Sequence, residues 1–579
     1  MFDEILGQGA AAIRWDLRIS VAAGILSILI LTRLITSIRS KVALGRSGDD
    51  KTPPILPYSL PGLGNLISFA FDTNKLLSDI ISKYGPNMPV RIRVLNTKLH
   101  FISGAESVLA IFKGSRDLTT APASIRVLEN AFGSPASVRH VYTRDNTGVF
   151  TQPLEDSNPL EPHNRIFAIT HKSLHGLLQG NGLKELAARF MYFLEAELSA
   201  LDVGHDEWTN IPDFYDLVKK SVFKASTTAL CGPTLFKLNP ELTDDFWEFD
   251  VHMPMLFKNL PRWVIPRAFA IRDKLKASIS KWHAYAEERF DHEDEALQKL
   301  EWEELFGTRL MRSRHVEFLA VDGFNEDAAA ASDLGMLWGT NANIIPMIGW
   351  EMIDILIRPE LLAQVREEIT SITGPSAKGS DIESHMPKLL ASPLLQSIYS
   401  EELRLRNGVL VQRVPIVDNF KLGNWKFPKG DMIVTSNWHE QRDRSVWNEG
   451  PVNGEMHSVD EFWAERFLVY PNDPNSGPGK PGRDTKSKAK VAVKEGDNSP
   501  VFTTDSVTGS YIPYGGGQKI CPGRFYAKQE AMGALSMFLT MFDIELDSND
   551  QPQPNMGYFP FGVLPLLGTF PARMRRRKV

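Results

Sequence analysis

The chain has few of the features that mark secreted or nucleic-acid-binding proteins. It has two cysteines in 579 residues, Cys231 and Cys521, and so small a number in a chain of this length is typical of a reducing compartment. No Asn-x-Ser/Thr sequon occurs, as expected of a domain that faces the cytosol. The net charge of −6 leaves no excess of positive charge, so nothing in the composition indicates nucleic acid as a partner.

Long apolar stretches are also scarce, and we expect a single membrane-spanning one, residues 19–38. Twenty helical residues span roughly 30 Å, and no small-residue cleavage site marks a removed signal peptide. Basic residues follow the stretch and acidic residues precede it: Arg39, Lys41 and Arg46 after it, Asp3 and Glu4 before it. The positive-inside rule therefore predicts a lumenal segment 1–18, a transmembrane helix 19–38 and a cytosolic remainder. A buried or interfacial helix is the alternative.

Proline is dense directly after this stretch. Four of the nine residues 53–61 are proline, which favours a stiff, extended connector over a flexible linker. We therefore assign residues 39–65 to a basic and proline-rich hinge and residues 66–579 to one large domain. Within that domain, residues 88–103 alternate as a hairpin does, and residues 162–319 are mostly helical in pattern. The polar stretch 470–502 is predicted to be a mobile surface insertion.

Glycine is densest directly before Cys521, in the run YGGGQKICPG from Tyr514 to Gly523. Residues 515–517 have no Cβ, so the backbone can take positive φ and lie against a flat cofactor. Pro522 suits the first turn of a following helix, which would place the Cys521 thiolate at a helix N-terminus, where N–H groups favour negative charge. The run resembles the haem-binding loop of the cytochrome P450 family, in which a Cys thiolate is the fifth iron ligand. A buried free cysteine is the alternative.

This resemblance implies a mainly α fold with small β-sheets, the triangular cytochrome P450 fold, for the catalytic domain 66–579. It also implies haem b as cofactor, with Cys521 as its axial ligand. The residues expected to contact the haem are Tyr514, Gly515, Gly517, Lys519, Gly523, Arg413, Arg165 and His171. Lys519 stands where the family usually has Arg or His at a haem propionate. The lysine keeps the positive charge but lacks the planar guanidinium that can donate two parallel hydrogen bonds. For each of these basic residues alone, an ordinary surface charge is the alternative.

Two further motifs follow the family's order and spacing. Residues 396–405 have a helical pattern in which Glu401 and Arg404 share one face, and FWAERF with Arg466 follows some 60 residues later. The resemblance implies a buried triad of Glu401, Arg404 and Arg466 that locks the fold around the haem and takes no part in the chemistry. A solvated ion pair is the alternative reading of Glu401 and Arg404 alone.

Residues 327–358 are predicted to form one long helix, with Ala342, Asn343 and Pro346 in its middle. The family usually places an acid and a Thr at the first two of these positions, to feed protons for oxygen activation. Asn in place of Thr resembles the branch with oxysterol hydroxylases and prostacyclin synthase. Because Pro346 cannot donate to the carbonyl of Ala342, we predict a kink whose free carbonyl and Asn343 hold a catalytic water. In the alternative, Asn343 only satisfies backbone groups.

The predicted substrate pocket is apolar, as expected for a lipophilic substrate. Its residues are Ile344, Ile345, Gly408, Val409, Leu410, Val411, Val563, Leu564 and Leu566. The resemblance implies a monooxygenase of the endoplasmic-reticulum membrane that oxidises a sterol, terpenoid, alkaloid or polyketide with O2. Because the chain has no flavin or nucleotide motif, electrons from NADPH would arrive through a separate NADPH–cytochrome P450 reductase.

Two stretches resemble fungal members of specialised metabolism, residues 229–233 (ALCGP) and 260–263 (LPRW). The region 256–267 would be the loop between two lid helices, which often dips into the membrane; an ordinary proline-broken loop is the alternative. Two other functions stay open. One is a reductase-independent peroxide isomerase or dehydratase of the prostacyclin synthase type, and the other is a haem-binding carrier without turnover.

Overall fold

The computed structural model describes residues 2–46, 48, 51–114, 116–452, 454–482 and 499–578, with side chains from Arg18 onwards. The chain forms two compact units. The first comprises Met1–Thr120 and Leu410–His439, and the second comprises Ala121–Val409 and Glu440–Val579.

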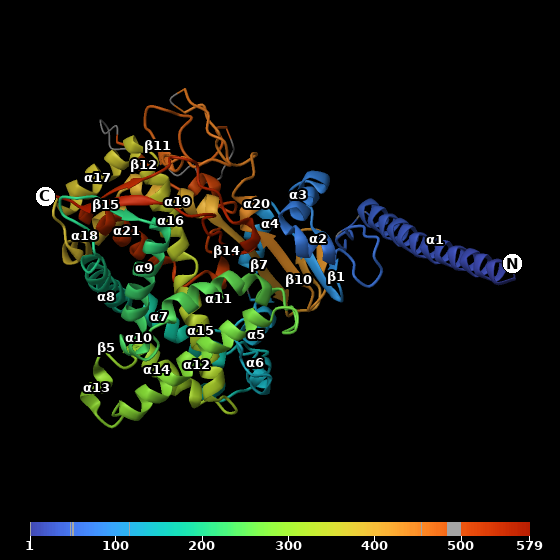
Figure 1. Cartoon of the computed structure of the whole chain (residues 1–579), viewed down its shortest axis with the longest axis horizontal. Helices are drawn as coiled ribbons and strands as arrows, with labels where there is room; N and C mark the ends of the chain where they lie inside the picture. Colours follow the sequence, from blue (N-terminus) through green and yellow to red (C-terminus); the bar gives the residue numbers. More distant parts are fainter. Residues whose placement is uncertain are drawn as a thin grey trace. The chain divides into compact units, whose positions relative to one another are not determined.

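The first unit begins with α1 (Phe2–Gly45), one uninterrupted helix (Figure 1). Its part Arg18–Gly45 is long and apolar enough to cross a membrane, and 6% of an apolar stretch of 18 residues within it is buried. The helix extends past both ends of the predicted span 19–38, because no proline occurs before Pro53 to interrupt it.

The proline-rich stretch returns along the end of this helix. Thr36 is buried, and its hydroxyl accepts a hydrogen bond from the Tyr58 amide at 3.2 Å and donates to the Tyr58 carbonyl at 3.1 Å. Arg33 donates to the carbonyl of Pro57. The second half of α1 is therefore tied to the segment that follows it in the chain.

A hairpin and two further strands form the sheet of the first unit. β1 (Val90–Val94) and β2 (Thr97–Phe101) are antiparallel with Val94 opposite Thr97, which confirms the predicted hairpin. β10 (Met432–Ser436) pairs with β2 in parallel, and β7 (Asn407–Pro415) pairs with β10 through its residues from Leu410 onwards. The other elements of the unit are α2 (Leu66–Phe71), α3 (Thr73–Tyr84), α4 (Ala105–Lys113), β3 (Leu118–Thr119), β8 (Phe420–Leu422) and β9 (Trp425–Phe427).

The second unit is mostly helical. Its helices are α5 (Ala121–Asn130), α6 (Arg139–Arg144), α7 (Ile166–Leu178), α8 (Gly180–Ser199), α9 (Phe214–Cys231), α10 (Thr234–Leu238), α11 (Leu242–Phe257), α12 (Pro266–Arg289), α13 (Glu295–Lys299), α14 (Arg309–Leu319), α15 (Glu326–Asn341), α16 (Ile344–Leu356), α17 (Pro359–Thr373), α18 (Gly379–Ala391), α19 (Pro393–Arg406) and α21 (Arg524–Met541). A short helix, α20 (Asn437–Glu440), spans the boundary between the units. Helices α8, α9, α16 and α21 pack side by side around one large apolar core (Figure 1).

The sheets of the second unit are small. β13 (Phe542–Leu546), β15 (Ala572–Arg576) and β4 (Thr209–Ile211) form one of them, and β14 (Phe561–Val563) pairs with the first residues of β7. Two-stranded pairs are β5 (Trp302–Glu303) with β6 (Gly307–Thr308), and β11 (Leu468–Val469) with β12 (Val501–Phe502). The expected mainly α fold with small sheets is confirmed. In the predicted insertion 470–502, residues 483–498 lie outside the described residues.

The long helix predicted over 327–358 is wrong in one respect, because it is two helices. α15 ends at Asn341 with Ala342 as its C-cap, and α16 begins at Ile344. Pro346 lies in the first turn of α16, where a backbone N–H has no partner inside the helix. The proline therefore suits the start of a second helix and does not kink a single one.

Candidate active site

The loop before Cys521 has the backbone that its glycines predict. Gly515 and Gly517 have φ of 68° and 67°, in the left-handed region, and Gly517–Lys519 form a 3-10 turn. The Cys521 amide donates to the carbonyl of Tyr514 at 3.1 Å and closes the loop. The Tyr514 hydroxyl, in turn, is hydrogen-bonded to that of Tyr399 on α19.

Cys521 carries a free and exposed thiol, whereas Cys231 is free and buried in α9. The surrounding chain is dense enough to raise the pKa of the Cys521 thiol through loss of solvation, and the N–H groups of Gly523 and Arg524 with the Arg524 charge oppose that rise. A Cβ on Gly523 would lie 3.7 Å from Sγ, so Gly523 lies in contact range of the thiol.

The predicted place of Pro522 in the first turn of the helix is wrong, because the helix begins two residues later. α21 begins at Arg524 with Gly523 as its N-cap, so Pro522 precedes the helix. Cys521 still lies just before the helix start, and its sulfur still accepts hydrogen bonds from the backbone N–H groups of Gly523 and Arg524. An accessible soft thiol, N–H donors aimed at it and left-handed glycines beside it together fit a haem iron held by Cys521.

The structure brings Glu401, Arg404 and Arg466 together, and all three side chains are fully buried. Glu401 Oε2 and Oε1 accept from Arg404 Nε and Nη2 at 2.7 and 2.9 Å, and Oε1 also accepts from Arg466 Nε at 2.9 Å. Burial alone would raise the pKa of Glu401, but the charges of the two arginines outweigh it and lower the pKa to about 2. Arg466 also donates to the Asn448 carbonyl at 2.6 Å, so the triad ties α19 to the segment after α20.

Asn343 lies at the break between α15 and α16, and its side chain is anchored on one side. Oδ1 accepts a hydrogen bond from the Val563 amide of β14 at 2.9 Å. Because an N–H can pair only with an acceptor, this bond fixes the orientation of the Asn343 amide. The two N–H donors of Nδ2 therefore point away from the bond with β14. Ala342, predicted beside it, is buried and offers no side-chain group.

The basic residues predicted for the haem propionates have different surroundings. Arg165 is buried and donates to Thr147 Oγ1 at 3.0 Å and to the carbonyls of residues 150 and 151 at 2.5 Å each, so it also fixes that loop. The His171 and His175 rings lie against each other, with centroids 4.1 Å apart and planes tilted by 40°. Burial, then His175, then the Lys519 charge lower the pKa of His171, so His171 and Lys519 are near neighbours.

Arg413 belongs to the first unit. Its guanidinium lies over the Phe112 ring at 5.7 Å, and burial lowers its pKa to about 10. The propionate roles of Arg413, Arg165, His171 and Lys519 remain predictions.

Most of the predicted pocket residues lie in the second unit, and Leu410 and Val411 lie in the first. Ile344, Ile345, Val563, Leu564 and Leu566 are buried, and Gly408 pairs with Gly562. The structure thus places β14 beside the α15–α16 break.

Sequence reasoning missed a buried polar cluster near that break. Tyr558 Oη and Trp338 Nε1 donate to Asp250 Oδ1 at 2.7 and 2.8 Å. The available signal was an acid on the apolar face of α11, between the buried residues Phe246, Phe249 and Met253.

The loop predicted between two helices at 256–267 does join α11 to α12. Trp263 within it is 84% exposed, and Val264 is exposed beside it. On α11, Val251 is 71% exposed and Met255 is also exposed, which leaves an apolar outer surface.

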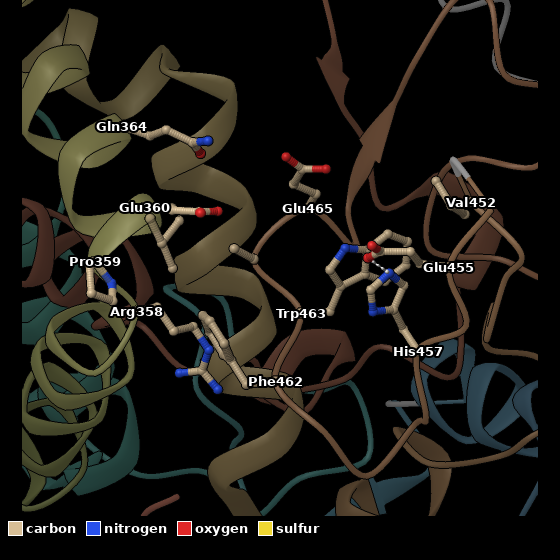
Figure 2. A pocket seen from close by; sticks show the side chains of 12 residues that line it. Arg358, Pro359, Glu360, Gln364, Val452, Glu455, His457, Phe462, Trp463 and Glu465 are labelled. Atoms are coloured by element: carbon tan, nitrogen blue, oxygen red, sulfur yellow. Dashed lines mark ion pairs between the residues drawn. The ribbon is translucent and has the colours of Figure 1, made fainter. Parts of the chain in front are cut away.

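A separate open cleft of about 570 Å³ lies between the start of α17 and residues 452–465 (Figure 2). His457 stacks on Trp463 there, with ring centroids 4.1 Å apart, and lies 4.0 Å from Glu455. Arg358 lies over Phe462 at 4.8 Å on the other side. The residues that line this cleft do not include Cys521 or Asn343, so it is distinct from the candidate active site.

Comparisons with known proteins identify the family to which the chain is similar. The family model described as cytochrome P450 matches residues 214–569. The chain is 36% identical to the cytochrome P450 monooxygenase efuG of Hormonema carpetanum over 95% of both chains, and 36% identical to the monooxygenase fsoE of Humicola fuscoatra over 94% of this chain and 91% of that one. It is 26% identical to the 25-hydroxycholesterol 7-alpha-hydroxylase of Rattus norvegicus over 75% of this chain and 90% of that one.

Proposed function

Since the chain belongs to the cytochrome P450 family, we propose that it is a membrane-anchored monooxygenase that oxidises a lipophilic substrate of fungal specialised metabolism. The observation that carries the proposal is the exposed Cys521 thiol in its glycine loop. Enzymes of this family are oxidoreductases that use a haem iron with a Cys thiolate ligand and electrons that originate from NADPH. When bound, the haem supplies the activation of O2.

The chain's own residues would position and protect this chemistry. Cys521 holds the cofactor, with the N–H groups of Gly523 and Arg524 moderating the charge on its sulfur. Asn343, anchored by Val563, would offer N–H donors to a bound reactant and has no acidic proton of its own. The buried apolar residues around the α15–α16 break exclude bulk water.

The substrate would be a rigid, apolar molecule such as a sterol or terpenoid. Two observations support this class. The pocket residues predicted in the second unit are apolar and buried, and one relative is named for its action on 25-hydroxycholesterol. The resemblance to two fungal monooxygenases supports a role in the biosynthesis of specialised metabolites.

The enzyme would lie in the endoplasmic-reticulum membrane, with α1 as its anchor and the remaining chain in the cytosol. The apolar span and the basic residues that follow it support this arrangement. A separate NADPH–cytochrome P450 reductase would then deliver electrons.

The test is a carbon monoxide difference spectrum of microsomes that contain the protein, reduced with dithionite or with NADPH and reductase. We expect the red-shifted band of a thiolate-bound haem with both reductants, and its loss in Cys521→Ser. Absence of the band under dithionite in folded protein would overturn Cys521 ligation. A band with dithionite alone, even in the presence of sterol and terpenoid candidates, would overturn the reductase-driven reaction and favour a peroxide isomerase.

A further inference from the structure

Asp250 is an acidic side chain buried inside the second unit, where three separate segments meet. It lies on α11 with 3% of its surface exposed. Its Oδ1 accepts hydrogen bonds from Tyr558, in the 3-10 turn Met556–Tyr558, and from Trp338 of α15. Two donors on one oxygen connect α11 to both of the other segments.

Within the described part of the chain, no Lys, Arg or His side-chain nitrogen lies within 4.0 Å of the Asp250 carboxylate. Asp250 therefore has no ion-pair partner there. The charged group that acts on it from a neighbouring helix is Lys219 of α9, which is itself paired with Asp216 at 3.3 Å. Tyr215 of α9 also faces it, with a buried hydroxyl beside the Leu566 backbone. Burial raises the pKa of Asp250 to about 6, although Tyr558, Trp338 and Lys219 oppose the rise.

Apart from Asp250 and Thr243, α11 buries only apolar side chains, among them Phe246, Phe249 and Met253. Its outer face is apolar and exposed at Val251 and Met255. Apolar contacts do not change with pH in the neutral range, whereas a buried carboxyl does. Asp250 is therefore a proton-dependent contact inside the core, in addition to the ion pairs of Asp245 with Lys274 and of Glu248 with Arg267.

The same cluster is linked to Asn343. Tyr558 lies four residues before Gly562, and a Cβ on Gly562 would meet both the Tyr558 ring, at 3.4 Å, and Asn343 Oδ1. The next residue, Val563, donates to Asn343. The end of α11 also packs against β14, because the Phe257 ring stacks on the Phe561 ring with centroids 5.2 Å apart.

We propose that Asp250 is a positioning residue: its hydrogen bonds with Tyr558 and Trp338 fasten α11 to the segment that orients Asn343, and one proton on Asp250 sets how readily α11 opens. A carboxyl whose pKa is higher in the closed state than in the open, solvated state favours the closed state as the pH falls. With a closed-state value of about 6 and an open-state value near 3.8, the ratio of closed to open α11 rises about fourfold from pH 7.5 to pH 5.5.

The test is hydrogen–deuterium exchange on the haem-loaded full chain, read as protection factors corrected for intrinsic exchange. We expect protection in 242–257 to rise about fourfold from pH 7.5 to pH 5.5 in the unaltered enzyme, with the rise beginning near pH 6. Asp250→Asn should abolish this rise. Tyr558→Phe removes one donor that lowers the pKa of Asp250, so it should lower protection at pH 7.5 and move the onset of the rise to higher pH.

His252, two residues along the same helix, is the matched control, because the hydrogen bonds that Asp250 accepts come from Tyr558 and Trp338. His252→Gln should keep the full rise. Glu241 and Glu248 of this region have lowered pKa values through Lys274 and Arg267, so they titrate below the window. A flat profile in the unaltered enzyme, a rise that persists in Asp250→Asn, or a rise lost in His252→Gln would overturn the proposal.

If Asp250→Asn does not fold, the unaltered enzyme, Tyr558→Phe and His252→Gln decide it alone. The consequence for catalysis rests on the proposed function, but the exchange measurement does not. A faster rate of substrate binding at pH 7.5 than at pH 5.5, followed by the shift of the haem absorption band, would connect α11 opening to substrate entry. Failure of the carbon monoxide test would leave the exchange result standing.

Discussion

Asn343 could contribute in two ways, through its bond to β14 or through its N–H donors, and different side-chain atoms serve the two. Oδ1 is bonded to the Val563 amide, so only the Nδ2 donors can serve a bound reactant. Asn343→Asp keeps an acceptor for Val563 but removes the donors, whereas Asn343→Ala removes both.

If the donors matter, both variants should lower product formed per NADPH by about tenfold or more, within the range of positioned proton-transfer and hydrogen-bonding groups. Asn343→Ala should in addition lower the free energy of unfolding by about 1 kcal/mol for the lost bond. Coupling of NADPH oxidation to product, measured with reductase and a confirmed substrate, checks this. Retained coupling in Asn343→Asp would mean that the anchor to β14 is sufficient.

Glu401 is the second residue whose environment yields a direct prediction. Its pKa is about 2 in the folded chain against 4.5 in the unfolded one, so its contribution to stability is present above pH 4.5 and is lost as the pH falls toward 2. Glu401→Gln leaves Arg404 and Arg466 buried without a counter-charge, which should cost about 3–5 kcal/mol.

We expect Glu401→Gln to lose most of its bound haem at neutral pH and to unfold at lower denaturant concentration than the parent chain. The control is Glu360→Gln, which changes an exposed acid at the start of α17. Equal haem content and equal midpoints in the two variants would contradict a structural role for the triad.

At the scale of single residues, the sequence predicts contacts between residues that are close along the chain and misses contacts between distant ones. The loop before Cys521 and the pair Glu401–Arg404 are local in sequence, so fixed spacings predicted their geometry. Asp250 is bonded to residues 88 and 308 positions away, and no local pattern encodes those pairs. Its place on an apolar helix face was the only signal that the sequence contained.

The break between α15 and α16 is the element on which the candidate site depends. β14 lies against it, and Gly562 is the point of closest approach because a side chain there would collide with Asn343 Oδ1. Gly562→Ala should therefore displace the Asn343 side chain and reproduce the uncoupling of Asn343→Ala while leaving Asn343 in place.

Gly339→Ala is the matched control, since a Cβ there meets nothing within 4 Å in the turn before the break. That change should keep coupling and stabilise α15 by up to about 1 kcal/mol, because alanine is the better helix former. Product per NADPH and thermal unfolding of both variants check the prediction. Coupling that is normal in Gly562→Ala would show that β14 does not position Asn343.

The same element explains why part of the fold escaped prediction. Residues 327–358 have a continuous helical pattern, and a proline at position 346 is compatible with a kink or with a new helix start. The structure has a new helix start, and the Asn343 side chain at the break is bonded to Val563 of a strand that is distant in sequence. The hairpin 90–101, in contrast, was predicted correctly because its turn and its pairing lie within a few residues.

For the whole molecule, the question is whether the catalytic chain depends on α1. The most apolar window of Arg18–Gly45 is only 6% buried, and the contacts that tie this helix to later residues gather at its second half, around Thr36 and Tyr58. Removal of residues 2–45 should therefore release the protein from the membrane without loss of its haem. We expect the shortened chain to leave the membrane fraction on carbonate extraction and to keep the thiolate–carbon monoxide band per mole of protein. A chain that lacks only residues 2–17 keeps the apolar span and should stay in the pellet. A shortened chain that resists carbonate would contradict α1 as the anchor, and one that is extracted without its band would show that α1 supports the fold.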